Sequence, residues 1–152
     1  MPTPTLELAV LCQDIETDAD GRPYNLQAPI FGFRWPADAK GLCRPRPSLK
    51  LYLRLRDPVG TFYIRAALRH EGVDANIYDT EPLELGFGPT PRPLPYELDL
   101  ELDELTFPRP GVYEMVIYAN HVSLHDPELV PIPFPPLRVK VLPADGSPGG
   151  AL

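Results

Sequence analysis

Proline is the feature that most constrains how this chain can fold. The 152 residues include 22 prolines, about three times the usual share of ~5%, and they lie in clusters between apolar segments. Proline lacks a backbone N–H and blocks helix interiors. No stretch longer than about a dozen residues both lacks proline and glycine and keeps the 3.6-residue apolar period of a helix. Long helices are therefore excluded, and short strands joined by proline-rich turns are favoured.

The clearest strand pattern lies at residues 49–56, where leucine occupies every second position. Residues 61–69 alternate in the same way, and the residues between the two segments are turn formers. A four-residue connection predicts a β-hairpin that sets Leu55 opposite Phe62. The leucine face of this hairpin would then point into the core.

The outer face of the predicted hairpin is the best candidate binding surface in the sequence. It would carry two tyrosines and two arginines: Tyr52, Arg54, Tyr63 and Arg65. Both residue types are enriched at interface hot spots because they bury much area and keep a polar tip. An arginine over a tyrosine ring is also a routine cross-strand pair, so a purely structural role stays open.

Further short strands are expected along the rest of the chain: Leu6–Cys12, Tyr24 to about Arg34, Leu83–Phe87, Tyr96–Leu105, Val112–Ala119 and Leu137–Leu142. Regular short strands separated by turns indicate an all-β fold, here a single antiparallel β-sandwich of about seven to nine strands with little or no helix. We expect the sandwich domain over residues 1–143 and a disordered C-terminal tail over residues 144–152.

Residues 130–136 have proline at every second position, so one edge of this segment lacks N–H donors. The pattern predicts an edge strand or an extended crossover, with Val130, Ile132 and Phe134 facing the core.

Residues 97–103 alternate leucine with carboxylates, so one face of the expected strand is wholly acidic: Glu97, Asp99, Glu101 and Asp103. The simplest interpretation is a solvated face whose charges partly pair with basic residues of neighbouring strands.

Charge and composition exclude several classes of partner. The net charge of −7 would repel polyanions, so we expect no nucleic acid partner. No apolar stretch is long enough for a signal sequence or a membrane span, which predicts a cytoplasmic protein with no membrane contact. Cys12 and Cys43 lack C-x-x-C spacing, and we expect them to be thiols rather than a disulfide or a zinc site.

One acidic segment resembles a calcium loop. Residues 14–21 offer alternate oxygen ligands before a glycine. The pattern departs from a helix-flanked calcium loop at Glu16 and Gln27, and Pro23 indicates a strand where a helix would follow. An ordinary hairpin turn at Asp20-Gly21 explains the same residues.

The sequence offers little for catalysis. His121, His125 and Asp126 are the candidate cluster, and a polar loop between strands is the simpler interpretation. No nucleophile elbow, phosphate loop or dinucleotide fingerprint is present. We assign no catalytic residue, no metal ligand and no cofactor.

The layout also resembles a group of small uncharacterised bacterial β-sandwich proteins, with an immunoglobulin-like or C2-like arrangement. The resemblance rests on Leu11-Cys12-Gln13-Asp14, on the turn Asp20-Gly21-Arg22, on the Pro-Gly-x-Tyr element within Phe107–Tyr118, and on Leu137-Arg138-Val139. It implies the fold and carries no activity, because that group has no established function. Asn120-His121 departs from the Asp-Gly or Asn-Gly of such hairpins and allows a longer loop.

These observations favour a non-enzymatic protein-binding or scaffold module whose partner is another protein or a second copy of the chain. Two alternatives stay open at this point: a calcium-dependent C2-like binding domain, and a small hydrolase assembled from loop residues.

Overall fold

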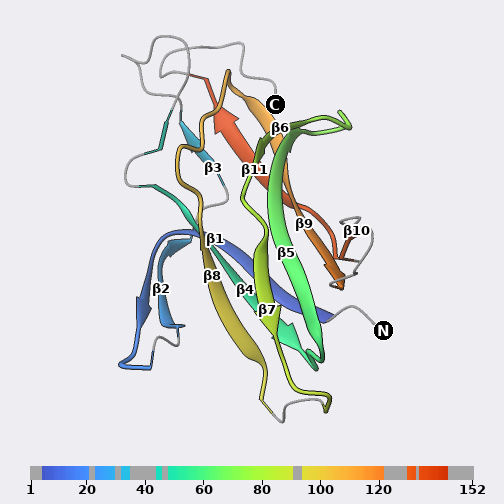
Figure 1. Cartoon of the computed structure of the whole chain (residues 1–152). Helices are drawn as coiled ribbons and strands as arrows, with labels where there is room; N and C mark the ends of the chain where they lie inside the picture. The colour runs from blue at the N-terminus through green and yellow to red at the C-terminus, as the bar shows by residue number, and fades with distance from the viewer. Residues whose placement is uncertain are drawn as a thin grey trace.

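The computed structural model describes residues 5–20, 23–29, 32–34, 44–45, 48–90, 94–121, 130–132 and 134–143, and every regular element in these residues is a β-strand (Figure 1). The strands are β1 (Thr5–Thr17), β2 (Pro23–Pro29), β3 (Gly32–Arg34), β4 (Lys50–Arg56), β5 (Thr61–His70), β6 (Asn76–Asp79), β7 (Leu83–Gly86), β8 (Tyr96–Glu101), β9 (Gly111–His121), β10 (Val130–Pro131) and β11 (Leu137–Leu142). The predicted tail at 144–152 lies outside the described residues.

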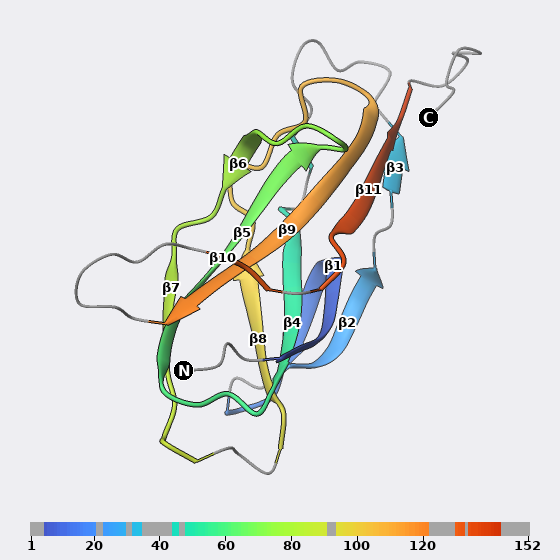
Figure 2. The same ribbon diagram turned by 90° about the vertical axis from the view of Figure 1, so that its right-hand side faces the viewer.

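Two sheets form the molecule, which confirms the predicted all-β sandwich. Sheet A has the order β2-β1-β4-β8, and sheet B has the order β3-β11-β9-β5-β6, with β10 beside β9 and β7 beside β5. Every pairing is antiparallel except that of β3 with β11. If β3 and β10, of three and two residues, are set aside, nine strands remain in the described part of the chain, at the upper end of the predicted number. Figure 2 shows the strands of sheet B side by side in front, with the strands of sheet A behind them.

The predicted hairpin between β4 and β5 is wrong. β4 lies in sheet A between β1 and β8, whereas β5 lies in sheet B beside β9. The connection crosses from one sheet to the other, and Asp57 (φ 53°) and Gly60 (φ 72°) both take the left-handed backbone conformation there. Leucines of β4 and apolar residues of β5 both face the core, as predicted, because a strand's two-residue period fixes its face without fixing its partner.

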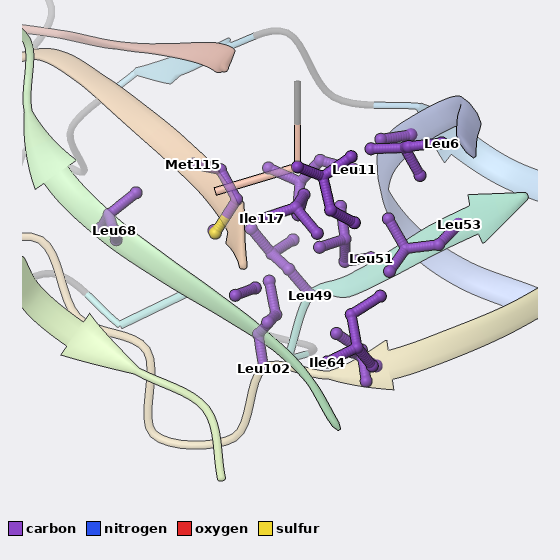
Figure 3. Close-up of a cluster of buried hydrophobic side chains, with 14 of the residues drawn as sticks. Leu6, Leu11, Leu49, Leu51, Leu53, Ile64, Leu68, Leu102, Met115 and Ile117 are labelled. Atoms are coloured by element: carbon purple, nitrogen blue, oxygen red, sulfur yellow. The ribbon is translucent and has the colours of Figure 1, made fainter. Parts of the chain in front are cut away.

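The core fills the space between the sheets, and Figure 3 shows side chains from both layers directed toward one another. Leucines alternate inward along β4, and each of Leu51, Leu53 and Leu55 has no exposed surface. Phe62, Ile64, Ala66 and Leu68 of β5 meet them from sheet B, with Met115 and Ile117 of β9. The described side chains between the two sheets therefore form one contiguous core.

Other strand boundaries differ from the prediction in informative ways. The expected strand at 24–34 divides into β2, in sheet A, and β3, in sheet B. β1 extends to Thr17 and forms an antiparallel hairpin with β2, as predicted for this segment, and Gly21 of the predicted turn lies outside the described residues. β6 was not predicted, because its four residues are mostly exposed and show no alternation of apolar side chains.

The proline-rich segment lies at the edge of β9, as predicted. Val130 and Pro131 of β10 pair with β9, and Ile132 N donates to Ile117 O at 3.0 Å. Ile132 is buried, and Phe134 packs partly against the core. Pro133 and the side chain of Val130 are outside the description. The segment then continues into β11 along the same edge of β9.

A tyrosine fixes the turn that leads from sheet A into β9. Tyr113 is fully buried, and its hydroxyl donates to the backbone carbonyl of Arg109, four residues upstream. Gly111 has φ 156°, which L residues rarely adopt. The Pro-Gly-x-Tyr element thus forms a tyrosine corner, in which a tyrosine hydroxyl hydrogen-bonds to the backbone a few residues upstream.

Candidate functional site

The structure separates the four residues of the predicted binding surface. Tyr52 and Arg54 belong to sheet A, where they lie opposite Asp99 and Glu97 of β8. Tyr63 and Arg65 belong to sheet B, where they lie opposite Asn120 and Tyr118 of β9. The two pairs therefore lie in different layers of the sandwich, and no shared surface forms from them.

Tyr52 is also inaccessible. It forms a second apolar cluster with Cys12 and Ile15, against which Leu8 and Val10 pack, and only 4% of its surface is exposed. Its hydroxyl donates to the carboxylate of Glu97. Burial raises the pKa of Tyr52, and the hydrogen bond to Glu97 raises it further. Tyr52 therefore serves the packing of sheet A.

Both arginines have partners within the chain. Arg54 Nε lies 3.4 Å from Glu7 Oε2. Arg65 lies 3.6 Å from Asp79 and places its guanidinium 4.9 Å from the ring centre of Tyr118. These cross-strand contacts fit a purely structural role for the two arginines, and each contributes about 0–1 kcal/mol to stability.

The candidate calcium and histidine sites are only partly described. Asp20 N donates to Asp18 Oδ1 at 2.9 Å in the turn after β1, while Gly21 lies outside the description. His121 ends β9 opposite Phe62, and His125 and Asp126 are outside the described residues. Within the part of the chain that is described, no group of three or more histidine, cysteine, aspartate or glutamate side chains could hold a metal ion.

The most distinctive site is an open cleft of about 810 Å³ between the two sheets. One wall comes from sheet A, from β8 and the turn after it, and the other comes from the β6–β7 edge of sheet B. The lining residues are Tyr78, Asp79, Thr80, Glu81, Pro82, Leu83, Asp99, Leu100, Glu101, Asp103 and Glu104.

The cleft is strongly acidic. Six of its lining residues are carboxylates, and none of those lining residues is basic. Among the described residues, Asp79 alone of the six has a cationic partner, Arg65. Glu81, Glu101, Asp103 and Glu104 are exposed. We refer to these six carboxylates and the surface between them as the acidic cleft.

Tyr78 joins the two walls of the acidic cleft. Its hydroxyl donates to the backbone carbonyl of Asp103 at 2.8 Å. Burial raises the pKa of Tyr78, and the negative charges of Asp103 and Glu104 raise it further. The same negative charges would stabilise a cation placed in the acidic cleft.

One wall of the acidic cleft could be predicted from the sequence, and the other could not. The predicted stripe contributes Asp99, Glu101 and Asp103 to the sheet A wall, whereas Glu97 accepts a hydrogen bond from Tyr52. Leu98, Leu100 and Leu102 are buried as expected. The wall at 78–83 gave no periodic pattern, and only the three-dimensional arrangement brings it to β8.

A smaller recess of about 380 Å³ beside β1 and β11 is mainly apolar and includes Phe134 and Pro135.

No protein-family model matches this sequence, and a comparison with curated proteins gives no match. No helix long and apolar enough to cross a membrane occurs in the described ranges.

Proposed function

We propose that this protein is a non-enzymatic protein-binding module whose acidic cleft receives a positively charged segment of another protein. The observation that carries the proposal is the set of six carboxylates around one cavity with no basic residue among its described lining. The cavity opens to solvent between two sheet edges, so a partner can enter without rearrangement of the core.

The physical argument rests on summed charge. An isolated exposed ion pair contributes only about 0–1 kcal/mol, but a cleft lined by charges of one sign concentrates the field and raises the local concentration of an oppositely charged partner. Such complementarity raises the association rate and selects the partner more than it raises affinity. Binding should therefore weaken with salt, since the Debye length is about 8 Å at physiological ionic strength.

The test uses two variants of equal net charge. Glu101→Lys/Asp103→Lys reverses two charges of the acidic cleft, and the control Glu84→Lys/Asp20→Lys reverses two exposed carboxylates outside it. The probe is a fluorescently labelled lysine- and arginine-rich peptide, and its anisotropy is measured against protein concentration at several salt concentrations.

We expect the cleft variant to bind the peptide at least ten-fold more weakly than the natural chain, which is about 1.4 kcal/mol. The control variant should bind within about two-fold of it. Equal losses in the two variants would show that net charge alone attracts the peptide and would refute the acidic cleft as the site.

A further inference from the structure

We call the side of β8 that faces away from β4 its open side, because no strand in the described residues pairs with it. The hydrogen-bond pattern shows which peptide groups of β8 point to this side. Leu102 N donates to Leu49 O at 3.0 Å, so these directly opposite residues form a hydrogen-bonded pair. Antiparallel pairs alternate between bonded and non-bonded, which makes Lys50 and Glu101 a non-bonded pair. The Lys50 carbonyl accordingly points toward β1, where it accepts from Cys12 Sγ at 3.5 Å.

The same alternation fixes the rest of β8. The peptide groups of Leu98 and Leu100 bond to β4, while those of Glu97, Asp99 and Glu101 are directed to the open side. Among the described residues no strand pairs with this side of β8, and no proline interrupts it. β8 can therefore accept another strand.

The opposite edge of the acidic cleft differs from β8 in this respect. β6 and β7 both pair with β5, and Thr80 N continues the ladder to Ala66 O at 2.9 Å. The chain then breaks its pairing at Glu81 and Pro82, and a proline at a sheet edge discourages strand addition. Of the two edges that face the acidic cleft, β8 is the one open to a partner.

The charges of β8 decide what that partner can be. A second copy of β8 would bring Glu97, Asp99 and Glu101 against their own equivalents, and like charges on directly opposed residues are destabilising. The strand that already pairs with β8 indicates which sequence suits it. That strand is β4, Lys50–Arg56, in which basic or amphipathic residues alternate with leucine. The exposed Leu83 across the acidic cleft gives a second strand apolar surface to cover.

We infer that the partner binds by adding a strand to the open edge of β8: an extended segment of another protein with lysine or arginine at alternate positions and apolar residues between them. This inference rests on the proposed function and specifies its binding mode. Backbone hydrogen bonds to β8 supply the attachment, and the alternating side chains supply selectivity.

The experiment uses peptides with the sequence of residues 50–56. One is unmodified, one has the same composition in scrambled order, and two are N-methylated on alternate residues, one on the odd set and one on the even set. Because alternate N–H groups of an added strand point to β8, only one methylated set should block binding. We expect that set to bind at least ten-fold more weakly than the unmodified peptide and the other set to bind within about two-fold.

The outcomes separate the binding mode from the proposed function. Equal affinity of the two methylated sets, whether reduced or unchanged, would overturn strand addition. The acidic cleft as a charge-selective site would still stand if the unmodified and scrambled peptides bound alike. Failure of both of those peptides to bind at millimolar concentration would overturn the proposed function itself.

A matched pair of variants tests the same inference on the protein side. Asp99→Asn removes one charge and keeps the outward N–H. Asp99→Pro removes the same charge and also the outward N–H, but it leaves the hydrogen bonds between β8 and β4 in place. We expect Asp99→Pro to bind the unmodified peptide at least ten-fold more weakly than Asp99→Asn, with thermal unfolding used to confirm that both are folded. Equal affinity of two folded variants would contradict strand addition, and the peptide comparison decides if Asp99→Pro does not fold.

Discussion

Replacement of Tyr113 by phenylalanine tests the tyrosine corner that leads the chain into β9. The hydroxyl donates to Arg109 O, while the ring packs against Phe107 at 4.9 Å and His70 at 4.6 Å between ring centres. Tyr113→Phe removes only the hydrogen bond, which is worth about 0.5–1.5 kcal/mol. Since Arg109 is exposed, water can replace the lost donor, and the expected loss is about 0.5–1 kcal/mol.

Thermal and denaturant unfolding measure this loss. In a domain of this size, 1 kcal/mol corresponds to about 2–4 °C in Tm, so Tyr113→Phe should lower Tm by about 1–4 °C. Tyr113→Ala also removes the ring and should cost about 3–5 kcal/mol. Tyr118→Phe, on the same strand but half-buried, is the matched control. If Tyr113→Phe were as stable as Tyr118→Phe, the hydrogen bond of the corner would contribute nothing to stability. If Tyr113→Phe lost as much stability as Tyr113→Ala, the packing of the ring would contribute nothing.

Two further predictions concern titratable groups. Burial and the nearby Arg109 cation lower the pKa of His70 below its usual 6.5, so the folded state favours neutral His70. The stabilisation that this gives is fully present above pH 6.5 and is lost as the pH falls through the pKa of the folded state. His70→Gln should flatten the decline of Tm between about pH 6.5 and 5, and parallel Tm curves for the two proteins would rule this out. Tyr52→Phe and Glu97→Gln should show a coupling free energy of about 1–2 kcal/mol in a double-mutant cycle of urea unfolding, near the lower end for hydrogen bonds to a charged group; additive effects would argue that the Tyr52–Glu97 hydrogen bond does not stabilise the fold.

Sequence pattern predicted the faces of the strands well and their partners poorly. The leucines of β4 had to face the core, because the alternation admits one buried face. The strands that pair with β4 could not be predicted, because a hairpin and a crossing between sheets give identical alternation on both sides of residues 57–60. The turn chemistry of Asp57 and Gly60 permits either path, and the pairing of β4 with β1 and β8 decides between them.

The candidate site shows the same division. The carboxylates of 97–103 are a local pattern, so their common face could be predicted. Asp79 and Glu81 reach the same cavity only because β6 and β7 pair with β5, which is a long-range property of the fold. Tyr52 was misassigned as a surface residue because its burial depends on Cys12 and Ile15 of β1, which are distant in sequence.

The crossing of the chain between sheets also determines when each layer can assemble during synthesis. β4 can pair with β1 early, but its second partner, β8, is translated only after β5, β6 and β7, and β5 cannot meet β9 until later still. Folds dominated by such non-local pairing fold in milliseconds to seconds. On the ribosome, the edge of β5 that pairs with β9 would therefore stay unpaired until β9 emerges, so we expect the nascent chain to depend on chaperones in this interval.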